Sequence, residues 1–187
     1  MKRVNFNTLP KDILIPKDDG LCNHLYGMEI PDISLLTTNG DYLKLRRKES
    51  FRLVLYFYPM TGRPDAKLPN NWNNIPGARG CTVENISFAD NYDELIKLNA
   101  VPIGITSQNI QDIKEMTSRL KVSHDILSDY NLDLAKLLRL PTFSVDGRTY
   151  IKRLTLIVDN LKVVKVFYPI FPPDKHINDV ILWLKNN

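Results

Sequence analysis

The chain has 187 residues, enough for one domain with a core that folds unaided, so we predict a single domain over residues 1–187. Its apolar content of 43% and charged content of 25% are typical of a globular protein. The net charge of +4 is mild, and the most basic cluster, Arg46-Arg47-Lys48, carries no interleaved aromatic residues, so we expect no nucleic-acid partner.

Cysteine and histidine usage narrows the chemistry further. Cys22 and Cys81 are too few for a disulfide-stapled secreted domain, and they do not form a C-x-x-C pair. The three histidines show no metal-ligand spacing, so we predict no metal and no other cofactor. The first residues lack the apolar region of a signal peptide, and the longest apolar run is far shorter than the ~20 residues of a membrane helix, so we expect a cytoplasmic protein without a membrane partner.

The first half of the chain predicts an arm, a hairpin and a central strand. Residues 1–31 contain turn signals and little periodicity, so we expect an irregular N-terminal arm laid over the domain. Strands over 33–36 and 42–45 are predicted to pair through Asn39-Gly40, a strong hairpin signal. The near-continuous apolar run 52–58 predicts a central strand that is buried on both faces.

A stretch without periodicity, rich in Pro, Gly and Asn, follows from residue 59 to residue 80. Loops this long inside a compact domain are usually functional or disordered. Apolar residues spaced by three and four then predict a helix of about sixteen residues, with this stripe on its buried face: Val83, Ile86, Ala89, Tyr92 and Ile96.

The second half predicts strands that alternate with helices. The expected elements are a buried strand over 101–106, a helix over 110–120, a strand over 125–129, a short helix from Asp133 to Leu138 with Asp133 as its cap, antiparallel strands over 149–159 and 161–168, and a last helix opened by Pro172-Pro173-Asp174. The order is β-hairpin, β-α-β-α-β-α, β-hairpin, α. It indicates an α/β fold with a mixed central sheet flanked by helices.

Cys81 stands where the long loop meets a helix. The free N–H groups at a helix N-terminus favour an anion, and Arg79 lies two residues upstream, so these features predict a lowered thiol pKa and a reactive thiolate. The bland interpretation is that Cys81 is a small buried apolar residue at the start of a core helix. The residues alone leave both interpretations open.

Motifs in one order along the chain resemble the peroxiredoxin family. FYP, a loop and then GCTxE resemble the family's active site; GITSQ, DILSDYNLDLAKLL and the strand that begins at Arg153 resemble three of its later segments. The resemblance covers residues 28 to 185 and is nearest the bacterioferritin-comigratory (Q-type) subgroup, in a branch with an insertion in the active-site loop. It implies a thioredoxin-like fold and a thiol-dependent peroxidase that acts on hydrogen peroxide or organic hydroperoxides.

The resemblance also implies roles for single residues. Cys81 would attack the peroxide and become a sulfenic acid. Arg153 would stabilise the thiolate and the charge that develops along the O–O bond. Pro59 would shield the pocket from water, while Arg79 and the turn at Gly80 would help to bind the peroxide.

Two departures from the family pattern stand out. The family's Thr-x-x-Cys motif has Ala78 at the threonine position, so Thr61 or Thr82 would have to supply the hydroxyl. The position five residues after Cys81, where Q-type members often carry a resolving cysteine, is Ile86. Both departures favour the alternative of a non-catalytic, thioredoxin-like redox-sensing or binding protein.

Regeneration of the sulfenic acid needs a second thiol. Cys22 is the one other cysteine, and it either resolves the sulfenic acid or packs against the domain without a redox role. If it packs, an external thiol such as thioredoxin, glutaredoxin or glutathione is the reductant. We expect a monomer or a homodimer.

Overall fold

The computed structural model describes residue 9 and residues 13–187, so the first part of the predicted arm, residues 1–8 and 10–12, lies outside the described residues. The strands are β1 (Ser34–Thr37), β2 (Tyr42–Lys44), β3 (Arg52–Phe57), β4 (Ala100–Thr106), β5 (Ile126–Ser128), β6 (Thr142–Val145), β7 (Arg148–Ile151), β8 (Leu154–Asp159) and β9 (Lys162–Phe167). The helices are the 3-10 turn η1 (Trp72–Asn74), α1 (Cys81–Asp90), α2 (Tyr92–Lys97), α3 (Ile110–Leu120), α4 (Asp133–Leu137) and α5 (His176–Asn186).

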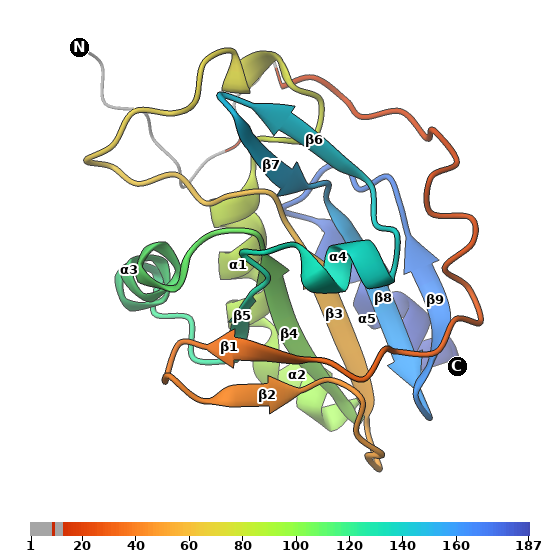
Figure 1. Ribbon diagram of the computed structural model, residues 1–187. Coiled ribbons are helices and arrows are strands. Elements are labelled where there is room, and N and C mark those ends of the chain that lie inside the picture. Colours follow the sequence, from red (N-terminus) through yellow and green to blue (C-terminus); the bar gives the residue numbers. More distant parts are fainter. Residues whose placement is uncertain (1–8, 10–12) are drawn as a thin grey trace.

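A mixed seven-stranded sheet forms the centre of the molecule, in the order β2-β1-β5-β4-β3-β8-β9 (Figure 1). β3, β4 and β5 are parallel neighbours, whereas β8 and β9 on one side and β1 and β2 on the other run antiparallel. The helical connections between the parallel strands are the βαβ units that the alternating pattern predicts. The mixed sheet and the β1–β2 hairpin are therefore confirmed.

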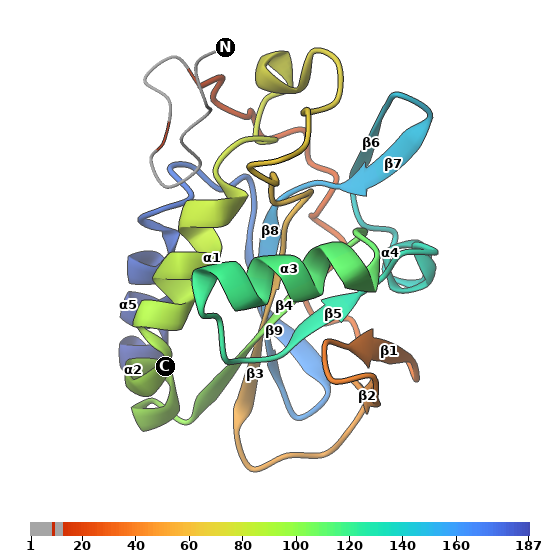
Figure 2. The same cartoon turned by 90° about the vertical axis from the view of Figure 1, so that its left-hand side faces the viewer.

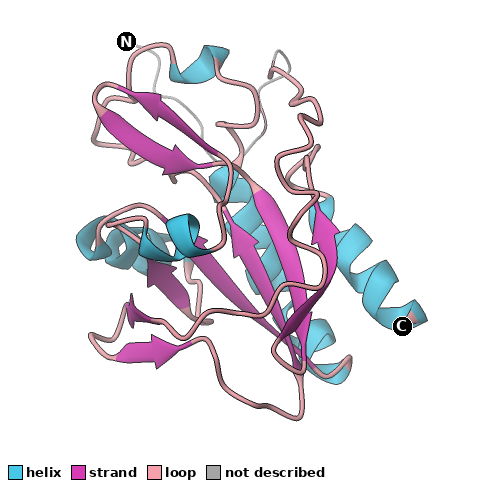
Figure 3. Ribbon diagram, turned by 45° about the vertical axis from the view of Figure 1, so that its right-hand side comes forward, coloured by secondary structure: helices cyan, strands magenta, loops and turns pink. Residues whose placement is uncertain are grey.

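β3 is buried on both faces because its side chains alternate between two apolar clusters. Leu53, Leu55 and Phe57 face the cluster that contains α4 and the described part of the arm. Val54 and Tyr56 face the cluster that contains α1, α3 and α5. Figures 2 and 3 show the sheet between these two layers, with α1 and α5 on one side and α4 on the other.

The predicted sixteen-residue helix is wrong in length, and its buried face is as predicted only in part. The helix breaks at Asn91 into α1 and α2, and Ile96, a member of the predicted stripe, is 42% exposed, whereas Val83 of the same stripe is buried. The side chains that α1 buries also include Cys81, Glu84, Asn85 and Phe88. Two of them are polar and are buried because each has a partner inside, so hydrophobic periodicity does not find them.

The predicted continuous strand 149–159 is also wrong. It is two strands, β7 and β8, separated by Lys152 and Arg153. β7 pairs with β6, an element that the sequence did not predict, in a hairpin outside the main sheet. Because Arg153 lies in this interruption, it belongs to neither strand. It lies just before the start of β8, where its side chain reaches the first residue of α1.

The cap of α4 differs from the prediction as well. Leu132 is the N-cap residue, and Asp133 is the first residue of the helix. Asp129, which is 1% exposed, satisfies the free N–H groups by accepting from Leu134 N at 3.1 Å and from Ala135 N at 2.9 Å. Among the described residues, no helix is both long and apolar enough to cross a bilayer.

Replacing Asp129 by alanine should lower the free energy of unfolding by about 1–2 kcal/mol, because two N–H groups at the start of α4 lose their acceptor. Chemical denaturation followed by circular dichroism measures this. Asp133→Ala is the matched control and should cost less than about 0.5 kcal/mol, since that side chain lies on the surface. Equal losses in the two variants would contradict the assignment of Asp129 as the cap.

Candidate active site

Cys81 is the first residue of α1 and is 2% exposed. The turn before it depends on Gly80, the N-cap residue, whose φ of 100° lies in the region that favours glycine. A β-carbon at position 80 would also collide with the side chain of Pro173. The start of α1 therefore packs closely against the loop that precedes α5. Cys81 lies at the beginning of the helix, as the sequence analysis predicted.

Arg153 reaches Cys81 from the connection between β7 and β8. Its Nη2 lies 3.1 Å from Sγ of Cys81 and donates to the carbonyl oxygens of Arg79, at 3.1 Å, and of Gly77, at 3.3 Å. Its Nη1 forms an ion pair with Glu84, one turn along α1 from Cys81. The structure thus brings together Cys81 and Arg153, the two residues that the sequence analysis placed at the centre of the chemistry.

Glu84 is the main residue of this site that the sequence analysis did not assign a role. It is fully buried, and its partner is the equally buried guanidinium of Arg153. A buried carboxylate needs such a pairing, because an unpaired charge inside a protein costs several kcal/mol. The signal was present in the sequence: Glu84 lies three residues after Cys81 and four before Phe88, on the buried face of α1.

The first half of the long loop returns to Cys81 through backbone groups. The N–H of Met60 forms a hydrogen bond with the sulfur of Cys81. Pro59 is held by its carbonyl oxygen, which accepts from the Thr106 hydroxyl at 3.0 Å. The two halves of the loop, separated by the insertion, therefore meet at the thiol.

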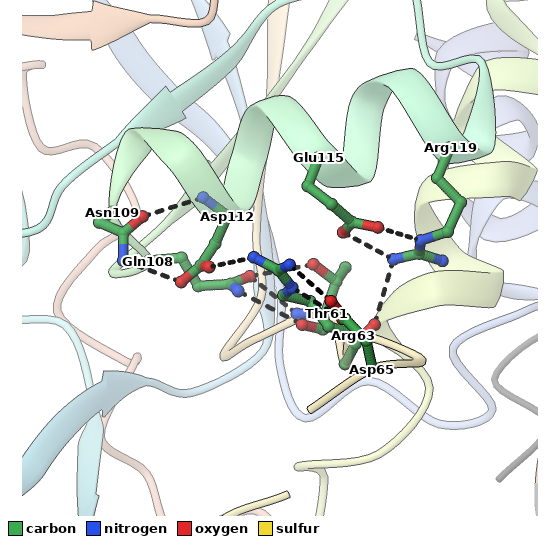
Figure 4. A network of polar contacts seen from close by, with 9 residues as sticks. Thr61, Arg63, Asp65, Gln108, Asn109, Asp112, Glu115 and Arg119 are labelled. Carbon is green, nitrogen blue, oxygen red and sulfur yellow. Dashed lines mark hydrogen bonds and ion pairs between the residues drawn. The ribbon is translucent and has the colours of Figure 1, made fainter. Parts of the chain in front are cut away.

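Thr61 lies next to this contact, but its polar groups are directed at Gln108. Its hydroxyl and its N–H both donate to Oε1 of Gln108, at 3.1 and 2.8 Å, and its carbonyl oxygen accepts from Nε2 at 3.3 Å (Figure 4). Gln108 precedes α3, so this pair ties the loop to the end of β4. We conclude that Thr61 fixes the path of the loop.

Ion pairs and a hydrogen bond also hold residues 62–65 against α3. Arg63 lies 3.6 Å from Asp112 and also pairs with Asp65. Arg119 donates to the carbonyl oxygen of Gly62 at 3.1 Å and is itself held by Glu115 (Figure 4). Residues 61–65 therefore lie along α3 before the chain enters the insertion.

The far end of the insertion rests on the β6–β7 hairpin. Trp72 is 2% exposed and packs on Phe143 and Tyr150, with ring centroids 5.7 and 5.0 Å away. Asp146 at the hairpin tip accepts from the N–H and side-chain amide of Asn70, at 2.7 and 3.1 Å. Ala78, at the family's threonine position, packs in the cluster around Trp72. Packing of Trp72 therefore anchors the insertion to the hairpin.

The pKa of the Cys81 thiol is shifted in the direction opposite to the one predicted from the sequence. Burial raises the pKa of the Cys81 thiol above its ordinary value, and the nearby Glu84 carboxylate raises it as well. Arg153 and the Met60 N–H lower the pKa, but they do not offset burial. The sequence argument counted the charges near the helix start and omitted the loss of solvent around the sulfur.

The same burial acts on Glu84. It raises the pKa of the carboxyl group to about 7 from an ordinary 4.5, even though Arg153 favours the charged form. One guanidinium therefore lies between two acids, Cys81 and Glu84, neither of which ionises easily when buried. Their titrations are coupled, because a negative charge on either one opposes a charge on the other.

The remaining predicted residues occupy different places. Arg79 directs its guanidinium at the side-chain oxygen of Asn73 and offers its carbonyl oxygen to Arg153. Thr82 is buried beside Cys81 in the first turn of α1. Cys22 is a buried free thiol in the apolar cluster on the opposite face of the sheet, where burial raises its pKa to about 12. Within the described part of the chain, no group of three or more potential ligands could hold a metal ion.

Comparisons of sequence and of structure place this chain in a known family. A family model described as Redoxin matches residues 25–181. Chloroplastic peroxiredoxin Q of Arabidopsis thaliana is 29% identical over 163 residues, which are 85% of this chain and 66% of that protein. The putative peroxiredoxin bcp of Coxiella burnetii is 25% identical over 161 residues, which are 83% of this chain and 95% of that protein.

Among solved structures, the crystal structure of peroxidoxin BcpB from Mycobacterium tuberculosis is similar to this fold, with a TM-score of 0.69 at 24% identity. The match covers 86% of this chain and 96% of that chain. This likeness confirms the predicted thioredoxin-like fold. The names of the sequence relatives agree with the Q-type subgroup that the motifs indicated.

Replacing Glu84 by glutamine should lower the pKa of Cys81, because the change removes a negative charge that opposes the thiolate and leaves Arg153 with one acid to pair. The ultraviolet absorbance of the thiolate, followed across a pH titration, measures the shift. Asp90→Asn, at the exposed end of α1, makes the same change of charge and should leave the pKa of Cys81 in place. An unchanged or raised pKa in the Glu84 variant would contradict the shared role of Arg153.

Proposed function

The chain belongs to the redoxin family, and from this premise we propose that Cys81 is the reactive thiol of a thiol-dependent peroxidase that reduces hydrogen peroxide or organic hydroperoxides. The observation that carries the proposal is the 3.1 Å contact between Sγ of Cys81 and Nη2 of Arg153 at the first turn of α1. Arg153 opposes the effect of burial on the pKa of Cys81, and a helix N-terminus also favours the thiolate.

The chemistry follows from these groups. The Cys81 thiolate attacks the terminal oxygen of R–O–OH, so an S–O bond forms while the O–O bond breaks. The O–O electron pair leaves on RO⁻, which takes a proton and departs as water or alcohol. The sulfur is oxidised to a sulfenic acid, the first and reversible stage of thiol oxidation. Arg153 stabilises the negative charge as it moves from sulfur to the leaving oxygen.

Backbone N–H groups supply the donors that orient the peroxide. The Met60 N–H reaches the sulfur, and the first N–H groups of α1 have no acceptor within the helix. Thr61 positions the loop through Gln108, and Thr82 lies beside the thiol in the same turn as Gly80. Ala78 offers no hydroxyl, and its carbonyl oxygen accepts from the Cys81 thiol at 3.6 Å. Pro59 keeps water from the thiol.

An external thiol reduces the sulfenic acid of Cys81 back to the thiol. Cys22 is 4% exposed and belongs to the apolar cluster on the opposite face of the sheet from Cys81, so it is not placed to attack the sulfenic acid. We therefore assign Cys22 to packing and assign reduction of the sulfenic acid to thioredoxin, glutaredoxin or glutathione. The cytoplasm, where thiols are kept reduced, fits two free cysteines, and the protein works there as a monomer or homodimer.

Replacing Cys81 by serine should reduce thiol-dependent peroxide consumption to the uncatalysed background, because no other described thiol can be oxidised at this site. Peroxide consumption with dithiothreitol as reductant measures the activity. Cys22→Ser is the matched control and should retain most of it. Full activity in the Cys81 variant would refute the proposal, and slow labelling of Cys81 by a sulfenic-acid probe would favour a non-catalytic redox sensor instead.

Replacing Arg153 by lysine should lower kcat/KM for peroxide by about 10²–10³-fold, because an ammonium group cannot bond the sulfur, Glu84 and two carbonyl oxygens in one plane. Steady-state kinetics at several peroxide concentrations measure the loss. Arg52→Lys, at the opposite end of β3, is the matched control and should leave kcat/KM within about twofold. A similar loss in both variants would indicate a general effect on folding.

A further inference from the structure

A pocket of about 330 Å³ lies beside Arg153. Five segments that are far apart in sequence form its walls: the arm, the end of the insertion, the start of β6, the connection between β7 and β8, and the stretch after β9. The residues that matter for its chemistry are Lys17, Gly77, Phe143, Lys152, Arg153 and Ile170. Its volume is at the lower end of the range for small-molecule sites, so it suits a compact ligand.

The lining of the pocket is apolar with a cationic rim. Three of the residues that line it are cationic, and none is acidic. Lys152 and Arg153 are each paired with an acid outside the lining, Asp19 and Glu84. Lys17 is exposed and makes no ion pair with another described residue. The pocket therefore favours a ligand with apolar parts and a carboxylate.

The pocket also adjoins the reactive sulfur. Arg153 is both part of its wall and 3.1 Å from Sγ of Cys81. Gly77, another wall residue, accepts from the same nitrogen of Arg153. A molecule that lies in this pocket can therefore contact the residue that bonds the reactive sulfur.

A small thiol suits this place better than the cysteine of a protein partner. Sγ belongs to a residue that is 2% exposed, so a broad protein surface cannot approach it without opening the loop. The one other cysteine of the chain, Cys22, is buried in the opposite cluster. The sulfenic acid therefore needs a reductant that is narrow enough to enter beside Arg153.

We propose that this pocket binds a low-molecular-weight thiol that carries carboxylates, such as glutathione, and that this thiol reduces the sulfenic acid of Cys81. The proposal rests on the peroxidase function above. The first thiol attacks the sulfur of Cys81–SOH, so that an S–S bond forms, the S–O bond breaks and water leaves. A second thiol attacks the mixed disulfide and releases Cys81–SH and the disulfide of the small thiol. Two thiols are oxidised for each sulfenic acid reduced.

The test separates the two half-reactions. The full chain is first oxidised with one equivalent of peroxide and then mixed with glutathione or with glutathione diethyl ester, which keeps the thiol but masks both carboxylates. At successive times, samples are quenched with dimedone, and the sulfenic acid that remains at Cys81 is counted as its dimedone adduct by intact-mass spectrometry. We expect glutathione to react about three- to fivefold faster, with a mixed disulfide at Cys81, and the advantage to shrink as salt is added.

A charge reversal in the pocket provides the matched variants. Lys17→Glu should remove the advantage of glutathione over its ester, whereas Lys114→Glu, on the exposed face of α3, should keep it. Equal rates for the two thiols in the wild type, equal effects of the two variants, or a Cys81–Cys22 disulfide would each overturn the proposal. Failure of peroxide to form any sulfenic acid at Cys81 would overturn the peroxidase function itself, and this inference with it.

Discussion

The guanidinium of Arg153 lies buried between two groups that can carry negative charge, Sγ of Cys81 and the carboxylate of Glu84. A buried cation is stable only where it is paired and hydrogen-bonded, and both terminal nitrogens of Arg153 have such partners. Those partners come from the first turn of α1 and from the loop just before it. The position of α1 against the end of β7 is thus set by the same contacts that prepare the thiol.

The same constraint explains the path of the active-site loop. Sγ and Arg153 must be covered on the side of β3, and the chain does so with Pro59 and Met60 before it leaves for the insertion. Gln108 and α3 hold the first half of the loop, and the β6–β7 hairpin holds the second half through Trp72. An insertion of this length leaves the site closed because each of its ends is anchored to a different element.

The sequence predicted the fold well where one interaction dominates. Runs of apolar residues identified β3, β4 and the last helix, because burial of apolar area is local in sequence and periodic. The prediction from sequence failed where a polar side chain is buried because of a partner that is distant in the sequence. Glu84 and Asn85 lie on the buried face of α1 because Arg153 and Tyr56 meet them there, and neither partner is near in sequence. The β6–β7 hairpin escaped notice for a similar reason, since its apolar face packs on the insertion rather than on the sheet.

The resemblance in motifs implied the contact between Arg153 and Cys81, whereas the electrostatics of these two residues were not predicted. Cys81 and Arg153 were paired correctly, but burial reverses the expected direction of the Cys81 pKa, and burial is a property of the whole assembly. The arm closes one side of the pocket beside Arg153, because Asp19 holds it to Lys152 at 2.7 Å and to Tyr168 at 2.8 Å. Lys152 and Tyr168 both line this pocket, so the same bonds fix the described part of the arm and the shape of the pocket.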